Sequence, residues 1–256
     1  MPELPEVELY GRYFATHALH KRIDRVRVLD DRILGAQRRP KFVRALTGKS
    51  FERVRRHGKH LFADAGDQWL HLHFGMSGDL SAYDDAIPRF ARVVFDFAGG
   101  THFAFEDMRL FGVAELTPDP ETFIREHDLG PDPLDAKFRL ADFRERVAGK
   151  RGAAKALLMS QDVIAGIGNL YADETLFQTA IHPRRALTAA DAKPLYAAMR
   201  KILTSTIERK ARGGSYPSKW LTPHREEGER CPRCGGEIGR AVVAGRTTYF
   251  CRRHQL

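Results

Sequence analysis

The spacing of apolar residues changes along this chain from a period of two to a helical period, and this change limits the possible folds most. Over residues 22–116 apolar side chains alternate with polar ones, as in residues 70–74. A period of two is typical of strands with one buried face. Residues 3–19 and the stretch 136–212 instead repeat apolar side chains at helical spacing. Strands followed by helices predict an α+β chain with more than one domain.

The strands of the first block are expected to be antiparallel. Residues 93–97 alternate up to Gly99 and Gly100, and residues 103–105 alternate after them. A glycine turn between two alternating runs is a hairpin signal. Several such runs predict an antiparallel β-sandwich or barrel, with the helix over residues 3–19 beside it.

A proline-rich segment separates the two blocks. Prolines and a glycine gather in it at Pro118, Pro120, Gly130, Pro131 and Pro133. Such residues punctuate regular structure. We therefore predict a β domain over 1–117, a linker over 118–135, a helical domain over 136–228 and a small C-terminal β-hairpin over 229–256.

The composition supports folded domains and favours a polyanionic partner. The 256 residues are 43% hydrophobic, and 42 Lys plus Arg exceed 33 Asp plus Glu, which gives a net charge of +9. An excess of this kind suggests binding to nucleic acid. No apolar run approaches about 18 residues and no signal pattern begins the chain, so we expect a cytoplasmic protein with no membrane partner.

The first residues carry a candidate nucleophile. Removal of Met1 would leave Pro2 as a secondary amine beside the Glu3 carboxylate. A free α-amino group has a pKa of about 8, so a fraction of it is neutral near neutral pH and can attack an aldehyde-like carbon. Glu3 could move protons in that step. Proline and glutamate are equally suited to an ordinary helix start, so both interpretations stay open here.

The last 26 residues contain the pattern of a zinc site. Cys231 and Cys234 are followed after sixteen residues by Cys251 and His254. Two close pairs on a short hairpin can surround one zinc ion tetrahedrally, and a site with four protein ligands is structural. Free cysteines or a redox pair are the alternatives, and without His254 the site would have three cysteine ligands.

Several motifs occur in one order from Pro2 to Gln255. They read Pro2-Glu3-Leu4-Pro5-Glu6-Val7-Glu8, Gly58-Lys59, His73-Phe74-Gly75-Met76-Ser77-Gly78, Asp107-Met108-Arg109-Leu110-Phe111-Gly112 and Gly166-Ile167-Gly168-Asn169-Leu170-Tyr171-Ala172-Asp173-Glu174. Together with the cysteine hairpin, they resemble the formamidopyrimidine-DNA glycosylase (Fpg, MutM) and endonuclease VIII family. The resemblance implies a β-sandwich domain, a helix-two-turn-helix domain and a hairpin with one structural Zn²⁺.

The resemblance also implies a bifunctional enzyme of base excision repair. Pro2 would attack C1′ of an extruded nucleotide and form a Schiff base, with Glu3 assisting ring opening and proton transfer. Elimination of both flanking phosphates would leave a one-nucleotide gap. Lys59 and Arg246 complete the implied catalytic set, both as phosphate contacts. On chemistry alone, Lys59 is a rival nucleophile or a solvated hairpin lysine.

The implied DNA contacts lie in two loops and a helix start. Met76, Arg109 and Phe111 would fill the gap left by the extruded base, although Met76 and Phe111 could also be core residues. Asn169 would bind a phosphate at a helix N-terminus, and Tyr171 of the same motif is expected at the DNA as well.

Two departures from the family pattern leave the substrate open. Fpg usually has a cysteine where His254 stands, and the stretch from Gly214 to Cys231 looks shorter than usual. We expect excision of formamidopyrimidines and 8-oxoguanine from damaged double-stranded DNA by a monomer in the bacterial cytoplasm, associated with the nucleoid when bound. The alternatives are an endonuclease VIII-like enzyme for oxidised pyrimidines and a non-catalytic damage-binding protein. A zinc-hairpin transcription factor would need a recognition helix after its metal ligands, which the sequence lacks.

Overall fold

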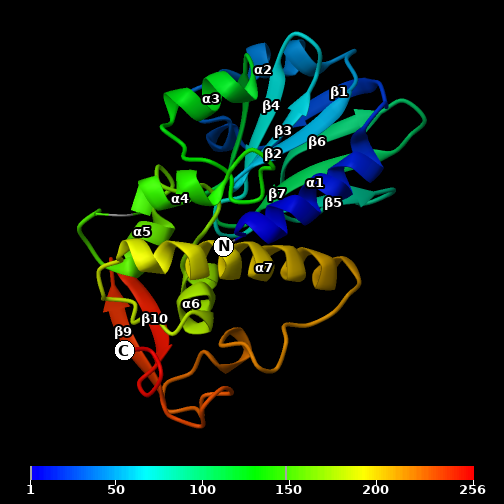
Figure 1. Ribbon diagram of the computed structural model, residues 1–256. Coiled ribbons are helices and arrows are strands. Elements are labelled where there is room, and N and C mark those ends of the chain that lie inside the picture. The colour runs from blue at the N-terminus through cyan, green and yellow to red at the C-terminus, as the bar shows by residue number, and fades with distance from the viewer. Residues whose placement is uncertain (1, 148) are drawn as a thin grey trace. The chain divides into compact units, whose positions relative to one another are not determined.

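The computed structural model describes residues 2–147 and 149–256, and the chain divides into two compact units. The first unit extends to His127, and the second runs from Asp128 to Leu256. Strands dominate the first unit, whereas helices and one red hairpin form the second (Figure 1). The α+β organisation that the periodicity predicts is therefore confirmed.

Two four-stranded antiparallel sheets form the first unit, as the predicted sandwich requires. In one sheet the order is β1 (Ile23–Val28), β6 (Ala91–Phe97), β7 (His102–Asp107) and β5 (Gly78–Tyr83). In the other it is β2 (Arg53–His57), β3 (His60–Asp64), β4 (Trp69–His73) and β8 (Val113–Thr117). The predicted hairpin at Gly99 and Gly100 joins β6 to β7.

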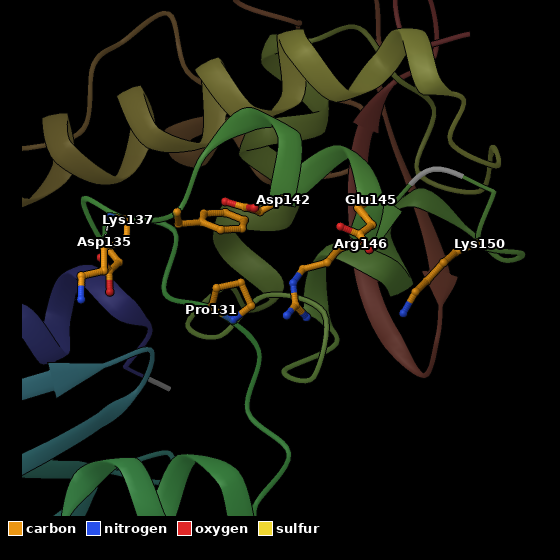
Figure 2. Close-up of a pocket in the computed structure, with 8 residues that line it drawn as sticks. Pro131, Asp135, Lys137, Asp142, Glu145, Arg146 and Lys150 are labelled. Carbon is orange, nitrogen blue, oxygen red and sulfur yellow. Dashed lines mark hydrogen bonds between the residues drawn. The ribbon is translucent and has the colours of Figure 1, made fainter.

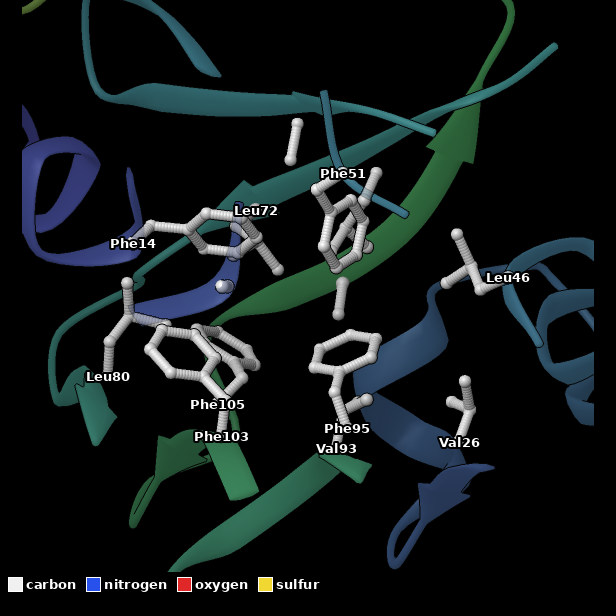
Figure 3. Packing of buried hydrophobic residues seen from close by; sticks show 14 of the residues in the cluster. Phe14, Val26, Leu46, Phe51, Leu72, Leu80, Val93, Phe95, Phe103 and Phe105 are labelled. Carbon is white, nitrogen blue, oxygen red and sulfur yellow. The ribbon is translucent and has the colours of Figure 1, made fainter. Parts of the chain in front are cut away.

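Apolar side chains from both sheets and from helix α1 (Leu4–Ala18) meet in one core (Figure 3). Phe14 of α1 packs edge-on against Phe51 and Phe103, with ring centroids 5.1 and 5.2 Å apart. Edge-to-face pairs of this kind add about 1 kcal/mol each to the burial of the rings. The core fixes α1 against the sheets, and with it the position of the N-terminal residues.

Helix α2 (Arg39–Leu46) interrupts the region predicted to be entirely β. Pro40 stands in its first turn, where a missing N–H costs nothing. Phe42 and Leu46, four residues apart, are both fully buried. Helical spacing of two large apolar residues thus prevails locally over the period of two. A short 3₁₀ helix, Asp31–Leu34, precedes α2.

Part of the segment predicted as a linker is also helical. Asp119 is the N-cap of helix α3 (Pro120–Glu126), and its side chain accepts a hydrogen bond from Thr122 N. Phe123 is only 5% exposed, because its ring packs on aromatic side chains of β3 and β4. The prolines mark the start of a helix here.

The second unit contains the longer helices and the C-terminal hairpin. Its elements are α4 (Leu140–Val147), α5 (Ala154–Met159), α6 (Asn169–Gln178), α7 (Ala192–Ala211), β9 (Ile238–Val243) and β10 (Arg246–Cys251), with 3₁₀ turns at Ala189–Asp191 and Thr222–His224. α7 packs on α4 and α6 through a buried face that includes Leu195, Met199 and Ile202. Among the described residues, no helix has the length and apolarity that crossing a bilayer requires.

Candidate functional site

The start of α1 holds the proposed nucleophile in a defined backbone. Glu3 and Glu6 form a reciprocal capping box, in which each side chain accepts from the other residue's backbone N–H; the Glu3 N to Glu6 Oε2 distance is 3.0 Å. Glu3 is 3% exposed, and Pro2 beside it is partly buried. Met1 lies outside the described residues. The cap fixes the direction in which the chain reaches Pro2.

Lys59 lies in the tight turn between β2 and β3 and is 8% exposed. Arg56 donates to Glu8 Oε2 of α1 at 2.9 Å and to the carbonyl oxygen of Gly58 at 3.3 Å. The side chains of Arg56 and Glu8 are 10% and 29% exposed, so this ion pair is partly shielded from solvent. Arg56 therefore ties the Lys59 turn to the helix that begins beside Pro2.

Three loops that carry predicted site residues leave the same edge of the β2–β3–β4–β8 sheet. His60, the first residue of β3, pairs with His73, the last of β4, and His73 pairs with Val113, the first of β8. The Lys59 turn, the loop 74–77 and the loop 108–112 consequently start or end at one row of the sheet. We call this row the loop edge.

Met76 and Phe111 extend from the loop edge into solvent. They are 45% and 55% exposed, and Met108, which the sequence interpretation did not single out, is 54% exposed. The Arg109 guanidinium lies over the Phe111 ring, 5.0 Å from its centroid. Exposure of this extent excludes the alternative that Met76 and Phe111 are core residues. Large exposed apolar side chains on neighbouring loops are unusual unless they meet a partner.

One buried acid joins these two loops. Asp107 has no exposed surface and accepts hydrogen bonds from Ser77 Oγ at 2.5 Å, Arg109 N at 3.1 Å and Gly112 N at 2.6 Å. The loop backbones also touch, because a Cβ added to Gly75 would come within 2.4 Å of the Phe111 carbonyl carbon. Glycine at this position, with φ of +52°, therefore allows the close approach. Asp107 belongs to a motif found in the sequence, but its partners are separated from it along the chain.

In the second unit, Asn169 is the first residue of α6, and Gly168 is its N-cap. The Gln161 side chain accepts from Gly166 N at 2.9 Å and donates to Ile167 O at 2.8 Å, which holds the turn before the helix. The Asn169 Oδ1 atom is buried without a hydrogen-bond partner in the described structure. Backbone N–H groups at a helix start suit an anion, as predicted for this motif.

Tyr171 and Arg246 lie in different surroundings. Tyr171 has no exposed surface, and its hydroxyl is 3.2 Å from that of Tyr216, so in this structure its ring has no surface for DNA. Packing explains this, because residues 171–177 of α6 are all buried, which leaves no face of this part of the helix exposed. Arg246 is exposed at the start of β10, directly after the turn that joins it to β9.

A buried ion network anchors the strand that carries Arg246. Lys155 of α5 forms a 2.7 Å ion pair with Asp173 of α6 and donates to Thr248 Oγ1 of β10 at 2.7 Å. Arg225 binds the second carboxylate oxygen of Asp173, also at 2.7 Å. Lys155 and Asp173 are both inaccessible to solvent, and each charge is paired, as burial requires. The network fixes β10 against α5 and α6.

The four predicted metal ligands converge at the C-terminal hairpin. The Sγ atoms of Cys231, Cys234 and Cys251 and one ring nitrogen of His254 all lie within 4.8 Å of one another. The Cys234–Cys251 Sγ distance is 3.4 Å, and Nδ1 of His254 is 3.5 Å from the Sγ atoms of both Cys231 and Cys234.

These distances fit one structural zinc ion. Ideal tetrahedral bonds place two sulfur ligands about 3.8 Å apart, and a sulfur and a nitrogen about 3.6 Å apart. A disulfide needs about 2.05 Å, so Cys234 and Cys251 are not bonded. Nε2 of His254 lies 3.3 Å from the Phe177 carbonyl oxygen, which accepts its N–H and leaves Nδ1 for the metal. The prediction of one zinc in the hairpin is confirmed.

A separate pocket of about 520 Å³ lies between α4 and the segment before it (Figure 2). Three acids and three bases line it with Pro131 and Phe138, namely Asp135, Lys137, Asp142, Glu145, Arg146 and Lys150. None of the predicted site residues contributes to its wall. The loops of the first unit and the helix start of the second unit, each taken by itself, therefore carry the predicted residues outside this pocket.

Family models match nearly the whole chain. Residues 1–114 match the formamidopyrimidine-DNA glycosylase N-terminal domain, residues 129–218 match the formamidopyrimidine-DNA glycosylase H2TH domain, and residues 228–253 match the zinc finger found in FPG and IleRS. The chain is 35% identical to a formamidopyrimidine-DNA glycosylase of Symbiobacterium thermophilum, over 100% of this chain and 89% of the relative. It is 33% identical to that of Desulforamulus reducens, over 98% of each.

Solved structures of similar proteins contain DNA. A MutM structure in complex with DNA containing carbocyclic 8-oxo-G superposes with a TM-score of 0.88 at 30% identity, covering 99% of each chain. Lactococcus lactis formamidopyrimidine-DNA glycosylase, non-covalently bound to DNA with an AP site, superposes with a TM-score of 0.87 at 28% identity, also over 99% of each chain.

Proposed function

Since the chain belongs to the formamidopyrimidine-DNA glycosylase family, we propose that it excises oxidised bases from duplex DNA and then cleaves the strand at the abasic site. Glycosylase activity is the activity for which the similar proteins are named. The lyase step, the residues that perform each step and the lesions accepted are our own inference from the residues of this chain.

The arrangement at the loop edge carries this proposal. Lys59 stands there on a turn tied to α1, next to loops that present Met76, Arg109 and Phe111. An enzyme that reacts at C1′ of a nucleotide must take the base out of the stack and support the DNA it leaves. Apolar wedges and an arginine with several donors suit that task.

Pro2 would supply the nucleophile. Its neutral secondary amine attacks C1′, the bond from C1′ to the base breaks, and the base leaves with a proton. Glu3, held within the cap of α1, would protonate the ring oxygen as the sugar opens and the iminium forms. Loss of a proton from C2′ then expels the 3′ phosphate by β-elimination. A further proton loss expels the 5′ phosphate, and hydrolysis frees Pro2.

The second unit would grip the DNA backbone. The N-terminus of α6 at Asn169 and the guanidinium of Arg246 offer phosphate contacts, the latter on a strand fixed by the Lys155 network. The zinc ion would hold the hairpin folded and would take no part in the reaction. Binding of damaged duplexes by the similar MutM and Lactococcus lactis proteins supports a DNA partner for this chain.

We propose formamidopyrimidines and 8-oxoguanine as the lesions, with oxidised pyrimidines as the second candidate class. The protein is proposed to act as a monomer in the bacterial cytoplasm. Matches to formamidopyrimidine-DNA glycosylase models favour the first class of lesion.

Borohydride trapping tests the proposal. Duplexes that carry 8-oxoguanine, a formamidopyrimidine, an oxidised pyrimidine or an abasic site are incubated with the protein, and mass spectrometry locates the reduced adduct. We expect a reduced adduct at Pro2 of the wild-type protein. A Pro2→Gly variant in which Met1 is retained should form no adduct. An adduct at Lys59 would assign the other amine as nucleophile. Binding to the lesions without any adduct, from zinc-loaded protein with Pro2 at its N-terminus, would favour a damage-binding protein.

A further inference from the structure

Imidazole rings line the outer face of the β2–β3–β4–β8 sheet near the loop edge. Strand alternation places His60 and Phe62 of β3, His71 and His73 of β4 and Glu115 of β8 on the face opposite the core. Phe123 of α3 covers them, with its ring centroid 4.1 Å from His71 and 5.3 Å from His60. His71 is only 2% exposed, so this is a buried polar layer and not a solvated surface.

Hydrogen bonds connect these groups in one direction. Glu115 Oε1 lies 3.0 Å from Nδ1 of His71, and Nε2 of His71 lies 2.9 Å from Nδ1 of His60. A carboxylate can only accept, so His71 carries its proton on Nδ1 and accepts at Nε2. His60 must then donate from Nδ1. Glu115, His71 and His60 thus form a chain with both tautomers fixed, provided that both rings are neutral.

The surroundings keep the rings neutral. Burial is the largest cause that lowers the pKa of His60, followed by the neighbouring imidazoles of His71, His73, His57 and His127. Burial also lowers the pKa of His71, against the opposing effect of Glu115. Protonation of His71 at Nε2 would remove the acceptor that His60 needs.

The hydrogen-bonded chain ends at His60, which lies next to the Lys59 turn and is paired with the strand that leads into the Met76 loop. His60 follows Lys59 directly and pairs with His57 across the β2–β3 turn and with His73 across the β3–β4 ladder. His73 in turn accepts a hydrogen bond from Gly75 N at 3.2 Å, one residue before Met76. A side chain that fixes His60 therefore fixes the residue at which the Lys59 turn ends.

We propose that His60 and His71 are positioning residues, which hold the Lys59 turn in place through the hydrogen-bonded chain from Glu115. The inference rests on the proposed role of Lys59 in phosphate binding and catalysis. Neither imidazole touches the substrate in this proposal. A displacement of a catalytic group by about 1 Å can cost about a hundredfold in rate, so the support of such a turn has measurable consequences.

A metal site is a poor alternative for these histidines. Among the described residues, the cluster of Cys231, Cys234, Cys251 and His254 is the group whose ligand atoms converge as metal ligands do. Nδ1 of His60 and Nε2 of His71 face each other at hydrogen-bond distance, and Nδ1 of His71 is bound to Glu115.

A double-mutant cycle tests the proposal on the full-length, zinc-loaded protein. His60→Phe keeps a stacking ring but removes the donor, whereas His60→Asn retains an N–H near the Nδ1 position. The readout is the single-turnover rate of borohydride-trapped adduct formation on an abasic duplex, with and without Lys59→Ala. His102→Phe is the matched control, because His102 is a partly buried histidine bound to Asp96 on the other sheet.

We expect His60→Phe to slow adduct formation about tenfold, His60→Asn to restore most of the rate, and the effect of His60→Phe to shrink below about twofold in the Lys59→Ala background. His102→Phe should show no such coupling to Lys59→Ala. Equal effects of His60→Phe in both backgrounds would overturn the positioning role and leave a general effect on folding. Loss of rate in His60→Asn equal to that in His60→Phe would also contradict it.

A second measurement does not depend on activity. Long-range ¹H–¹⁵N spectra distinguish imidazole tautomers, and both His60 and His71 should be protonated on Nδ1 near pH 7. Nε2–H tautomers would overturn the inference even if the enzyme is active. If the wild-type protein forms no adduct, or if Lys59→Ala does not change the rate, the proposed function of the site is wrong. The tautomers of His60 and His71 then still show whether the hydrogen-bonded chain exists.

Discussion

The Ser77 hydroxyl donates a 2.5 Å hydrogen bond to a carboxylate oxygen of Asp107, across thirty positions of sequence. The bond joins the loop that carries Met76 to the loop that carries Arg109, and the carboxylate has no exposed surface. Because the same acid binds Arg109 N and Gly112 N, two loops that each expose large apolar side chains have one support. The residues proposed to fill the gap therefore depend on a residue that need not touch DNA.

Asp107→Asn should loosen both loops. An amide offers one accepting oxygen and two donors, whereas the loops present a hydroxyl and two backbone N–H groups, so at least one buried donor loses its partner. We expect a loss of about 2 kcal/mol in the free energy of unfolding and weaker binding to an abasic duplex. Ser77→Ala, which removes the bond to Asp107 and the bond that Ser77 Oγ accepts from Arg109 N at 3.0 Å, should cost about 1 kcal/mol, because Arg109 N keeps its bond to Asp107. Urea unfolding and a binding titration measure both, and equal stability of Asp107→Asn and wild type would contradict the support role.

Removal of the zinc should unfold the C-terminal hairpin. Cys251→Ser should abolish stoichiometric zinc, because three ligands remain and Cys251 is fully buried. His254→Cys should keep the metal, since a fourth thiolate also suits zinc. Metal content by mass spectrometry and protease cleavage within 229–256 report the result. Zinc retained at full occupancy in His254→Ala would instead indicate a site with three cysteine ligands.

The stability of the first unit should fall in mild acid. Burial lowers the pKa of His73 from 6.5 to about 4, with further lowering by His71 and Lys59 and an opposing effect of Asp107. Between these pH values the unfolded protein binds more protons than the folded one. The contribution of His73 to the free energy of unfolding is therefore fully present above about pH 6.5 and is lost as the pH falls toward about 4. His60 and His71 act in the same direction.

His73→Asn tests this pH dependence, because asparagine can still accept from Gly75 N but does not titrate. We expect the loss of unfolding free energy between pH 7 and pH 4 to shrink by on the order of 2 kcal/mol relative to wild type. Denaturant unfolding at a series of pH values measures the difference. An unchanged pH profile would show that other groups dominate the acid response.

DNA binding should weaken steeply as salt rises. Each phosphate neutralised releases counterions, so the logarithm of the association constant falls linearly with the logarithm of salt concentration. Arg246→Ala should lower the magnitude of that slope by about 1, because one phosphate contact is lost. Lys150→Ala, which changes a base in the separate pocket, is the matched control. Identical slopes for Arg246→Ala and wild type would show that Arg246 does not contact a phosphate.

Much of the fold could be predicted because its signals are local. The period of two, the Gly99–Gly100 hairpin and the helix that starts near Glu3 each depend on residues a few positions apart, and the structure contains all three. The cysteine and histidine pairs likewise fixed the identity of the metal ligands. The α2 helix and the α3 helix were missed, because Phe42 and Phe123 gain their stability from burial against distant residues.

The sequence by itself determined which residues could react or bind: the amine at Pro2, the acid at Glu3, the base at Lys59 and the zinc ligands of the hairpin. Only the tertiary structure decided how these groups are held. Arg56 meets Glu8 across 48 positions, His71 meets Glu115 across 44, and Tyr171 turns into the core. Such pairings follow from the register of strands and the packing of helices, and no local spacing in the chain encodes them.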